Sequence, residues 1–226
     1  MKITYYGHSC FAVQVGDDHI LFDPFISPNE LARDVDIDRI DADYIFISHA
    51  HFDHIFDASR IAERTGATVI GNWEIREWAI KNGIKNTHPM NPGEQWAFPF
   101  GTVKCVNAVH SSSFSDGSYG GSACGFVFKT SCGNFYYSGD TALTLDMELI
   151  RRWTALDLLI LPIGDALTMG PADAIEVSKM LDVTKVMGVH YDTFGFIRID
   201  HEEVNQQFKD NDIYLLLPPV GGTLTL

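Results

Sequence analysis

The sequence has few of the features that mark secreted, membrane-spanning or disulfide-rich proteins. It contains four cysteines in 226 residues, Cys10, Cys105, Cys124 and Cys132, with no CxxC pair among them. No basic segment followed by an apolar run opens the chain, so we expect no secretory signal. The apolar run at 158–161 is far too short to span a membrane. These absences predict a cytoplasmic protein without a membrane partner, whose four reduced cysteines are buried as small apolar side chains.

Positive charge is also scarce. Lysine and arginine together number 16 against 30 aspartates and glutamates, which gives a formal net charge of −14. A field of this sign repels phosphate backbones, so nucleic acid is not expected as a partner. The acidic residues are spread along the chain and are best explained by solubility.

No segment rich in proline, serine or glycine divides the chain. The 46% content of hydrophobic residues is enough to bury a substantial core. We therefore expect a single domain over residues 1–226.

The order of apolar patterns predicts two mixed sheets with helices outside. Strands are expected at 3–6, 10–15, 19–23, 44–48, 67–70, 95–98, 102–109, 124–129, 134–138, 156–161, 186–189 and 213–217. Helices are expected at 55–65, 73–81, 145–153, 171–181 and 201–209. A Ser- and Gly-rich stretch at 111–121 is interpreted as a mobile loop. Strands followed by strand–helix alternation, twice over, favour an α/β (α+β) protein built as a four-layer αββα sandwich.

The segment Ser48-His49-Ala50-His51-Phe52-Asp53-His54 contains four side chains able to bind a metal. It directly follows an apolar strand and precedes a helix. Residues two apart on an extended segment project to the same side, so His49 and His51 can reach one cation. Asp53 and His54 then lie in the strand-to-helix turn. Such a polar group beside a buried strand is costly unless something pairs with it, which indicates a metal site.

Three further candidates stand singly at the ends of predicted strands. His110, Asp140 and His190 each follow an apolar run. Polar residues that end strands lie at the rim of a sheet, where loops build functional sites. Together with the cluster they are sufficient for two coordination shells.

This pattern resembles the metallo-β-lactamase superfamily, over essentially the whole chain. The resemblance implies the αββα fold and assigns the ligands of two metal ions: His49, His51 and His110 for the first, Asp53, His54 and His190 for the second, and Asp140 as the bridge. The namesake lactamases carry cysteine at the corresponding single-ligand position and commonly replace the residue equivalent to His54. Asp140 and His54 therefore point away from antibiotic hydrolysis.

A narrower resemblance is to the small UlaG-like metal-dependent hydrolases, which are related to ascorbate-phosphate lactonase. It rests on Gly7-His8-Ser9, Leu21-Phe22-Asp23-Pro24 and Thr168-Met169-Gly170-Pro171. In that branch asparagine follows the His-Tyr pair of the last ligand motif, whereas this chain has Asp192. Asp192, together with Asp165 and Thr168, is a candidate to face the substrate.

The donor set predicts hydrolysis of a small molecule. Imidazoles and carboxylates without a thiolate suit two divalent ions, with zinc expected and manganese, iron or nickel as alternatives. Such ions lower the pKa of bound water to about 7, so that hydroxide can attack an ester, lactone or phosphodiester. Asp53 is the candidate to guide and shuttle the proton, and His8 is the candidate for a second catalytic group. Asp23 is expected to support a metal ligand.

Two other functions stay open at this point. The same fold hosts di-iron oxidoreductases, although these typically carry glutamate where His51 stands and an additional flavin domain. A metal-binding module without catalysis is the second alternative, and the complete ligand set argues against it.

Overall fold

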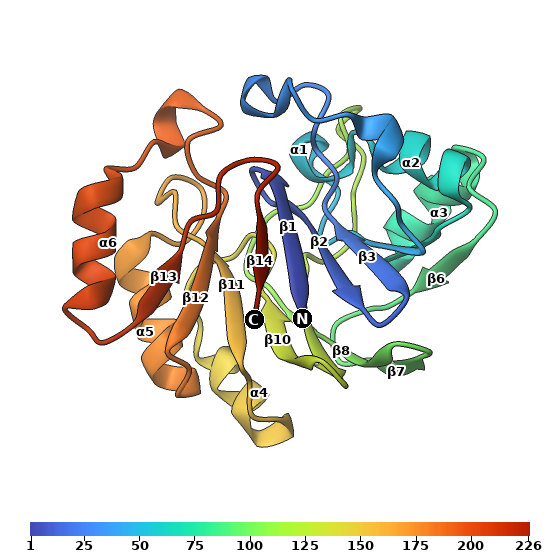
Figure 1. Ribbon diagram of the computed structural model, residues 1–226. Coiled ribbons are helices and arrows are strands. Elements are labelled where there is room, and N and C mark those ends of the chain that lie inside the picture. The colour runs from blue at the N-terminus through green and yellow to red at the C-terminus, as the bar shows by residue number, and fades with distance from the viewer.

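The computed structural model describes residues 1–226 as two seven-stranded sheets packed face to face, with helices on the outer sides (Figure 1). This confirms the predicted α/β sandwich of two mixed sheets. The first sheet contains, in spatial order, β14 (Thr223–Thr225), β1 (Lys2–Gly7), β2 (Cys10–Val15), β3 (Asp18–Phe22), β4 (Tyr44–Phe46), β5 (Thr68–Gly71) and β6 (Thr87–Pro89). The second contains β13 (Tyr214–Leu216), β12 (Lys185–Val189), β11 (Leu158–Pro162), β10 (Gly133–Tyr137), β9 (Cys124–Thr130), β8 (Gly101–Asn107) and β7 (Gln95–Phe98).

Helices cover the outer face of each sheet. The α-helices are α1 (Phe52–Ile55), α2 (Ala58–Thr65), α3 (Trp73–Lys81), α4 (Glu148–Trp153), α5 (Pro171–Leu181) and α6 (His201–Lys209). Short 3-10 helices are η1 (Glu30–Ala32), η2 (Ile37–Arg39), η3 (Leu145–Met147) and η4 (Gly195–Ile197). Helices α2 and α3 pack on the first sheet, and α5 and α6 on the second. None of the helices combines the length and the apolar composition needed to cross a membrane.

Strand direction brings several strand ends to one edge of the sandwich. In the second sheet, β10, β11, β12 and β13 run parallel. Strand β8 runs the same way as β10, since both are antiparallel to β9. The carboxyl ends of β8, β10 and β12 therefore open at the same edge, where loops can build a site.

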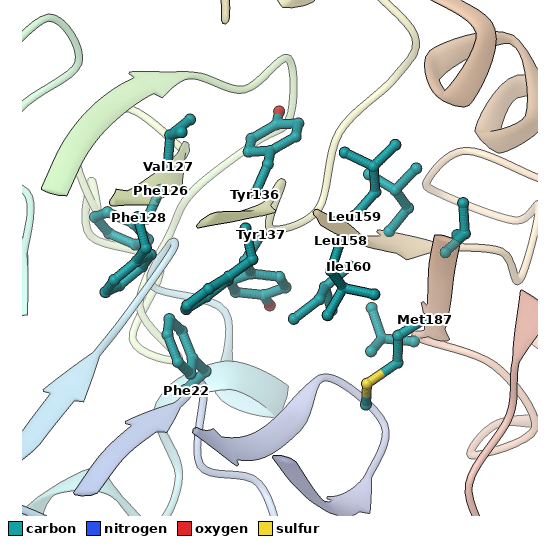
Figure 2. Packing of buried hydrophobic residues seen from close by; sticks show 14 of the residues in the cluster. Phe22, Phe126, Val127, Phe128, Tyr136, Tyr137, Leu158, Leu159, Ile160 and Met187 are labelled. Carbon is teal, nitrogen blue, oxygen red and sulfur yellow. The ribbon is translucent and has the colours of Figure 1, made fainter. Parts of the chain in front are cut away.

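The core between the sheets is dense in aromatic rings. Phe22 of β3 stacks on Phe11 with ring centroids 4.4 Å apart. It meets Phe128 and Tyr137 of the opposite sheet edge-on at 5.4 and 5.5 Å (Figure 2). Each offset or edge-on pair adds about 0.5–1.5 kcal/mol beyond the area it buries. A second, smaller cluster lies between the first sheet and its helices and includes Ile61 of α2. The sheets are thus held rigidly enough to position side chains at their shared edge.

Several predicted boundaries were wrong, and the reasons are tertiary. Strands β6 and β14 were missed because each has only three residues and forms against a neighbour already in place. The helix expected at 55–65 begins only at Ala58, as α2, and a separate short helix, α1, precedes it at Phe52–Ile55. Cys132 is exposed, whereas the other three cysteines are buried as predicted, and all four are free.

Asp57 lies between α1 and α2 and binds a loop through its side chain. Its buried carboxylate accepts hydrogen bonds from the backbone N–H groups of Ile26 and Ser27 at 2.7 and 2.9 Å, and from the Ser27 hydroxyl at 2.7 Å. These bonds join α2 to the loop that follows β3. Asp57 stands at the N-cap of α2 but makes no capping bond to it, because its carboxylate satisfies the loop instead.

Asp57→Ala should lower the free energy of unfolding by about 2–4 kcal/mol, because two loop N–H groups would lose their acceptor. Urea unfolding followed by circular dichroism measures this. Asp36→Ala is the control, since the exposed Asp36 carboxylate accepts only from the backbone N–H of Asp38, at 3.1 Å. The control should cost no more than about 1 kcal/mol. Equal losses in the two variants would contradict the role assigned to Asp57.

Candidate metal centre

The structure brings all seven predicted metal-binding side chains together at the shared edge of the two sheets. They come from segments that follow four different strands: His49, His51, Asp53 and His54 after β4, His110 after β8, Asp140 after β10, and His190 after β12. The carboxyl ends of β8, β10 and β12 lie at the edge described above, and Asp140 lies within 4.0 Å of His49 and His54, which follow β4 of the other sheet.

Three histidines form the first group of donors. Donor atoms of His49, His51 and His110 all lie within 4.8 Å of one another. His49 Nε2 is 2.9 Å from His51 Nδ1, and both rings lie close to His110, with centroids 5.0 and 5.1 Å away. Three nitrogen donors at this spacing can surround one cation.

Asp53, His54, His190 and His8 form the second group, again with donor atoms within 4.8 Å of one another. Asp53 Oδ2 is 3.9 Å from the Nε2 atoms of both His54 and His190. Three of these four residues are the ones that the sequence resemblance assigned to a second ion. His8, the fourth, was predicted as a catalytic residue.

Asp140 lies between the two groups. Its Oδ2 is 4.0 and 3.7 Å from the Nε2 atoms of His49 and His110, and 3.3 and 2.9 Å from those of His54 and His190. A single carboxylate therefore faces donors of both groups.

Unpartnered buried atoms provide a test of whether the residues fit metal ions. His54 Nε2 and Asp140 Oδ1 are buried and have no hydrogen-bond partner. Buried polar atoms without partners are costly and rare in native proteins. Imidazole and carboxylate donors are common ligands of zinc and of other divalent first-row ions. The donor set and its unpartnered atoms fit divalent metal ions.

The electrostatics of the first group favour neutral imidazoles. Burial lowers the pKa of His49 well below its usual value. Burial also lowers the pKa values of His51 and His110. A histidine must be neutral to bind a metal, so these residues are held in the binding form.

The centre of the site attracts positive charge. Burial opposes protonation of His54, but the carboxylates of Asp140 and Asp23 outweigh it and raise its pKa well above the usual value. Burial likewise opposes ionisation of Asp140, yet His190 and His54 hold its pKa well below the usual range. The same carboxylates that favour a proton on His54 would favour a metal cation in its place.

A buried carboxylate, Asp23, binds residues that carry or neighbour the candidate metal ligands. It accepts hydrogen bonds from the backbone N–H and the hydroxyl of Ser48 at 2.7 and 2.6 Å, and from the Tyr137 hydroxyl. His54 Nδ1 is 2.7 Å from Asp23 Oδ2. This bond orients the ring so that Nε2 faces the centre, and Asp23 thus supports His54, as predicted for it.

The backbone is strained where it carries site residues. His8, Asp23 and His190 have φ values of 57°, 38° and 56°. Non-glycine residues rarely adopt this left-handed region, and such strain clusters at functional sites. Gly139, before Asp140, has φ of 60°, and a Cβ there would lie 2.7 Å from Ser48 Cβ. Only glycine allows the end of β10 to approach Ser48 so closely.

Three residues at the site were not found from the sequence. Thr193 Oγ1 lies 3.1 Å from His8 Nδ1, Ser111 Oγ lies 3.3 Å from His51 Nε2, and Tyr137 reaches Asp23 from the opposite sheet. A hydroxyl residue near a ligand has no distinctive spacing, although the position of Thr193 three residues after His190 is a weak signal. Side-chain hydroxyls that orient ligands become visible only when the segments are brought together.

The three candidates for substrate contact make hydrogen bonds or contacts within their own loops. Asp192 accepts from the backbone N–H of Ile199 at 3.1 Å and lies 2.6 Å from His201 Nε2, so it holds the loop containing η4. The carboxylate of Asp165 lies against Gly170. The Thr168 hydroxyl donates to the Met169 carbonyl. None of these bonds reaches a residue of the two donor groups.

Asp23→Asn should lower the affinity for zinc by about 10–100-fold, because the amide cannot accept all the bonds that the carboxylate accepts around His54. Titration against a zinc-binding dye measures the affinity. Asp192→Asn is the matched control, since its bonds hold a loop rather than a ligand. If the two variants bound zinc equally well, Asp23 would not support the centre.

The comparisons with known proteins agree with this geometry. Residues 18–191 match the family model for the beta-lactamase superfamily domain. Over its whole length the chain is 51% identical to a UPF0173 metal-dependent hydrolase of Christiangramia forsetii, with 100% of both chains covered. Its fold is similar to that of Igni18, a metallo hydrolase from the archaeon Ignicoccus hospitalis, with a TM-score of 0.89, 31% identity and 100% and 97% of the two chains covered.

The fold alone is also similar to that of an isothiocyanate hydrolase from Delia radicum gut bacteria, with a TM-score of 0.83, 19% identity and 100% and 99% of the two chains covered. The resemblance predicted from the sequence is confirmed at the level of the superfamily. The chain belongs to the beta-lactamase superfamily and, within it, to the UPF0173 metal-dependent hydrolases.

Proposed function

We propose that this protein uses two divalent metal ions, with zinc as the expected metal, to hydrolyse a small ester, lactone or phosphodiester. The observation that carries the proposal is the position of Asp140, whose Oδ2 faces His49 and His110 on one side and His54 and His190 on the other. A carboxylate in that position can bridge two ions. The complete donor set and the hydrolase family favour this reading over a di-iron oxidoreductase or a non-catalytic metal-binding module.

The residues would divide between the two ions as the donor groups do. His49, His51 and His110 would hold the first ion, Asp53, His54 and His190 the second, and Asp140 both. When bound, such ions lower the pKa of water to about 7 and polarise the oxygen of the scissile group. The remaining chemistry falls to the side chains around them.

Asp53 is the proposed proton acceptor. It is the carboxylate of the second group that reaches the surface, with 13% of its side chain exposed against 3% for Asp140. Its Oδ2 is 3.1 Å from His8 Nε2, which leaves Oδ1 free of that bond. Burial favours the neutral acid, but the hydrogen bond with His8 and the charge of His54 lower its pKa below the usual value. Asp53 is therefore ionised near pH 7, and its Oδ1, which lies outside the His8 bond, is the atom proposed to accept a proton from water.

His8 is proposed to position Asp53. Its side chain is fully buried, and both ring nitrogens are engaged, Nε2 with Asp53 and Nδ1 with Thr193. Burial lowers its pKa to about 4, so the ring is neutral near pH 7. A neutral ring whose Nδ1 accepts from the Thr193 hydroxyl can donate from Nε2 to the carboxylate. His8 thus acts on the reaction through Asp53, without contacting the substrate itself.

The compartment and domain organisation are proposed on similar grounds. Four unpaired cysteines favour a reducing compartment, which we take to be the cytoplasm. Residues 1–226 are proposed to act as one domain on a small molecule, since the donor groups take residues from both sheets.

Removing metal should abolish hydrolysis and leave the fold intact. The reason is that the core between the sheets does not depend on the centre, unlike the core of a zinc finger. Dialysis against a chelator, followed by far-ultraviolet circular dichroism and an assay with 4-nitrophenyl acetate, bis(4-nitrophenyl) phosphate and γ-butyrolactone, measures both effects. Restored turnover on adding zinc completes the test. Global unfolding on chelation, or full activity without metal, would contradict the proposal.

Asp53→Asn and Asp140→Asn should separate chemistry from metal binding. Asp53→Asn keeps the size of the side chain but removes the proton acceptor, so turnover should fall by at least about 100-fold, which is about 3 kcal/mol of barrier. Asp140→Asn should lose far more metal, because both donor groups face that carboxylate. Metal content by mass spectrometry and turnover on the same samples measure the two effects.

Two results would remove Asp53 from this role. If Asp53→Asn lost metal as completely as Asp140→Asn, its inactivity would reflect ligation alone. Near-normal turnover with bound metal would show that another group accepts the proton.

A further inference from the structure

Three phenylalanines form an exposed surface beside the metal centre, here called the aromatic wall: Phe52 of α1, Phe194, and Phe196 of η4. Phe52 is 48% exposed and Phe196 62% exposed. The Phe194 ring lies between them, 6.3 Å from Phe52 and stacked at 5.6 Å on Phe196. The wall is thus one continuous surface assembled from two segments far apart in the sequence.

The wall is built on a firm base. The buried Phe25 lies beneath it, 5.6 Å from Phe52 and 6.2 Å from Phe194. Phe196 is mostly exposed, so it contributes little to the core. Contiguous exposed apolar surface of this kind marks a binding site more often than it serves stability.

The wall begins where the proposed chemistry takes place. Phe52 directly precedes Asp53 in the chain. On the other side, the Phe194 ring meets the ring of His8 edge-on at 5.5 Å, and His8 Nε2 is 3.1 Å from Asp53 Oδ2. A group bonded to the scissile centre of a substrate at Asp53 would therefore extend onto these rings.

The side chains of the two donor groups offer an anionic substrate no lysine or arginine. Every ion pair of the two donor groups joins histidine to aspartate, and none includes lysine or arginine. Arg198, two residues beyond Phe196, lines a separate cavity with Asp165 and Glu203. Recognition of a phosphate usually uses arginine or lysine, so a phosphorylated substrate would lack its customary partner here.

We infer that the aromatic wall binds an apolar alkyl or aryl group of a neutral ester or lactone, whose carbonyl lies at the metal centre. This inference rests on the proposed function and narrows its substrate class. It also assigns a role to Phe194 and Phe196, which follow His190 in the chain but bind no metal.

The test compares zinc-loaded wild type with Phe196→Ser, Phe196→Leu and Tyr214→Ser. Tyr214 is a matched control, because it is an exposed aromatic residue, at 65%, on β13. Each protein is assayed with two γ-lactones that differ only in a methyl or a hexyl substituent. Zinc content and mass in solution, from light scattering, are measured on the same samples.

Wild type should prefer the hexyl lactone in kcat/KM by at least about tenfold, since each buried methylene favours binding. Phe196→Ser should reduce this preference by about tenfold, mainly through KM, while Phe196→Leu retains most of it. Tyr214→Ser should behave as wild type, and zinc content should be unchanged in all variants.

A binding measurement separates this inference from the proposed function. The hexyl and methyl lactones are titrated into zinc-loaded Asp53→Asn, with and without Phe196→Ser, by calorimetry. If no ester, lactone or phosphodiester is hydrolysed but the hexyl lactone binds more tightly than the methyl lactone and Phe196→Ser weakens that binding, the inference about the wall holds and the proposed function fails.

Two other outcomes would overturn the wall. The first is the absence of a preference, seen as equal kcat/KM values of the wild type for both lactones or as equal losses of kcat/KM for both in Phe196→Ser. This outcome would leave the proposed function intact. The other is a fall in mass from an oligomer to a monomer in Phe196→Ser, which would identify the wall as an interface between copies of the chain.

Discussion

The Asp23 carboxylate, fully buried at the end of β3, joins the parts of the protein that make the site. It accepts from Ser48 of the first sheet's β4 segment and from Tyr137 of the second sheet, and it orients His54. A buried carboxylate is tolerable only when donors surround it, so these bonds are interdependent. Because Ser48 precedes His49 and Tyr137 precedes Asp140 by a few residues, this one group sets the spacing between ligands carried by different sheets. The geometry of the centre thus follows from how the sheets are joined, as well as from the ligands themselves.

The centre concentrates features that folding alone would avoid. Partnerless buried atoms of His54, Asp140 and His190 lie within a region where His8, Asp23 and His190 hold strained backbone conformations. Each feature is unfavourable by itself, and the aromatic core between the sheets provides the stability that tolerates them. Metal ions would give the buried His54 Nε2 and Asp140 carboxylate partners, which would offset the cost of burying them.

The surroundings of the centre divide into two kinds of surface. Beneath it lie hydroxyls and carboxylates that orient ligands, such as Asp23 and Thr193. Beside it lies the aromatic wall, which has no polar partner to offer a substrate. A centre flanked by apolar rings fits the proposed preference for a small neutral molecule with one reactive carbonyl and an apolar substituent. The net charge of −14 is consistent with this preference over anionic substrates.

Much of the site was predictable because its signals are local. The spacing of His49, His51, Asp53 and His54 after an apolar run lies within one short segment, and His110, Asp140 and His190 each end a run of strand-forming residues. The alternation of strand and helix patterns likewise determined the two-sheet fold, since layers must bury one face of each element. These features depend on residue type and short spacing, which the sequence displays directly.

Other features were decided only by tertiary structure. The Asp57 carboxylate at the start of α2 binds the backbone of Ile26 and Ser27, in a loop far earlier in the chain. Strands β6 and β14 exist because neighbouring strands supply their hydrogen bonds. Thr193 meets His8, and Phe194 meets Phe52, across separations that no periodicity encodes. Local pattern determined which residues could bind metal, whereas long-range packing decided which side chains support them and which surface the substrate would meet.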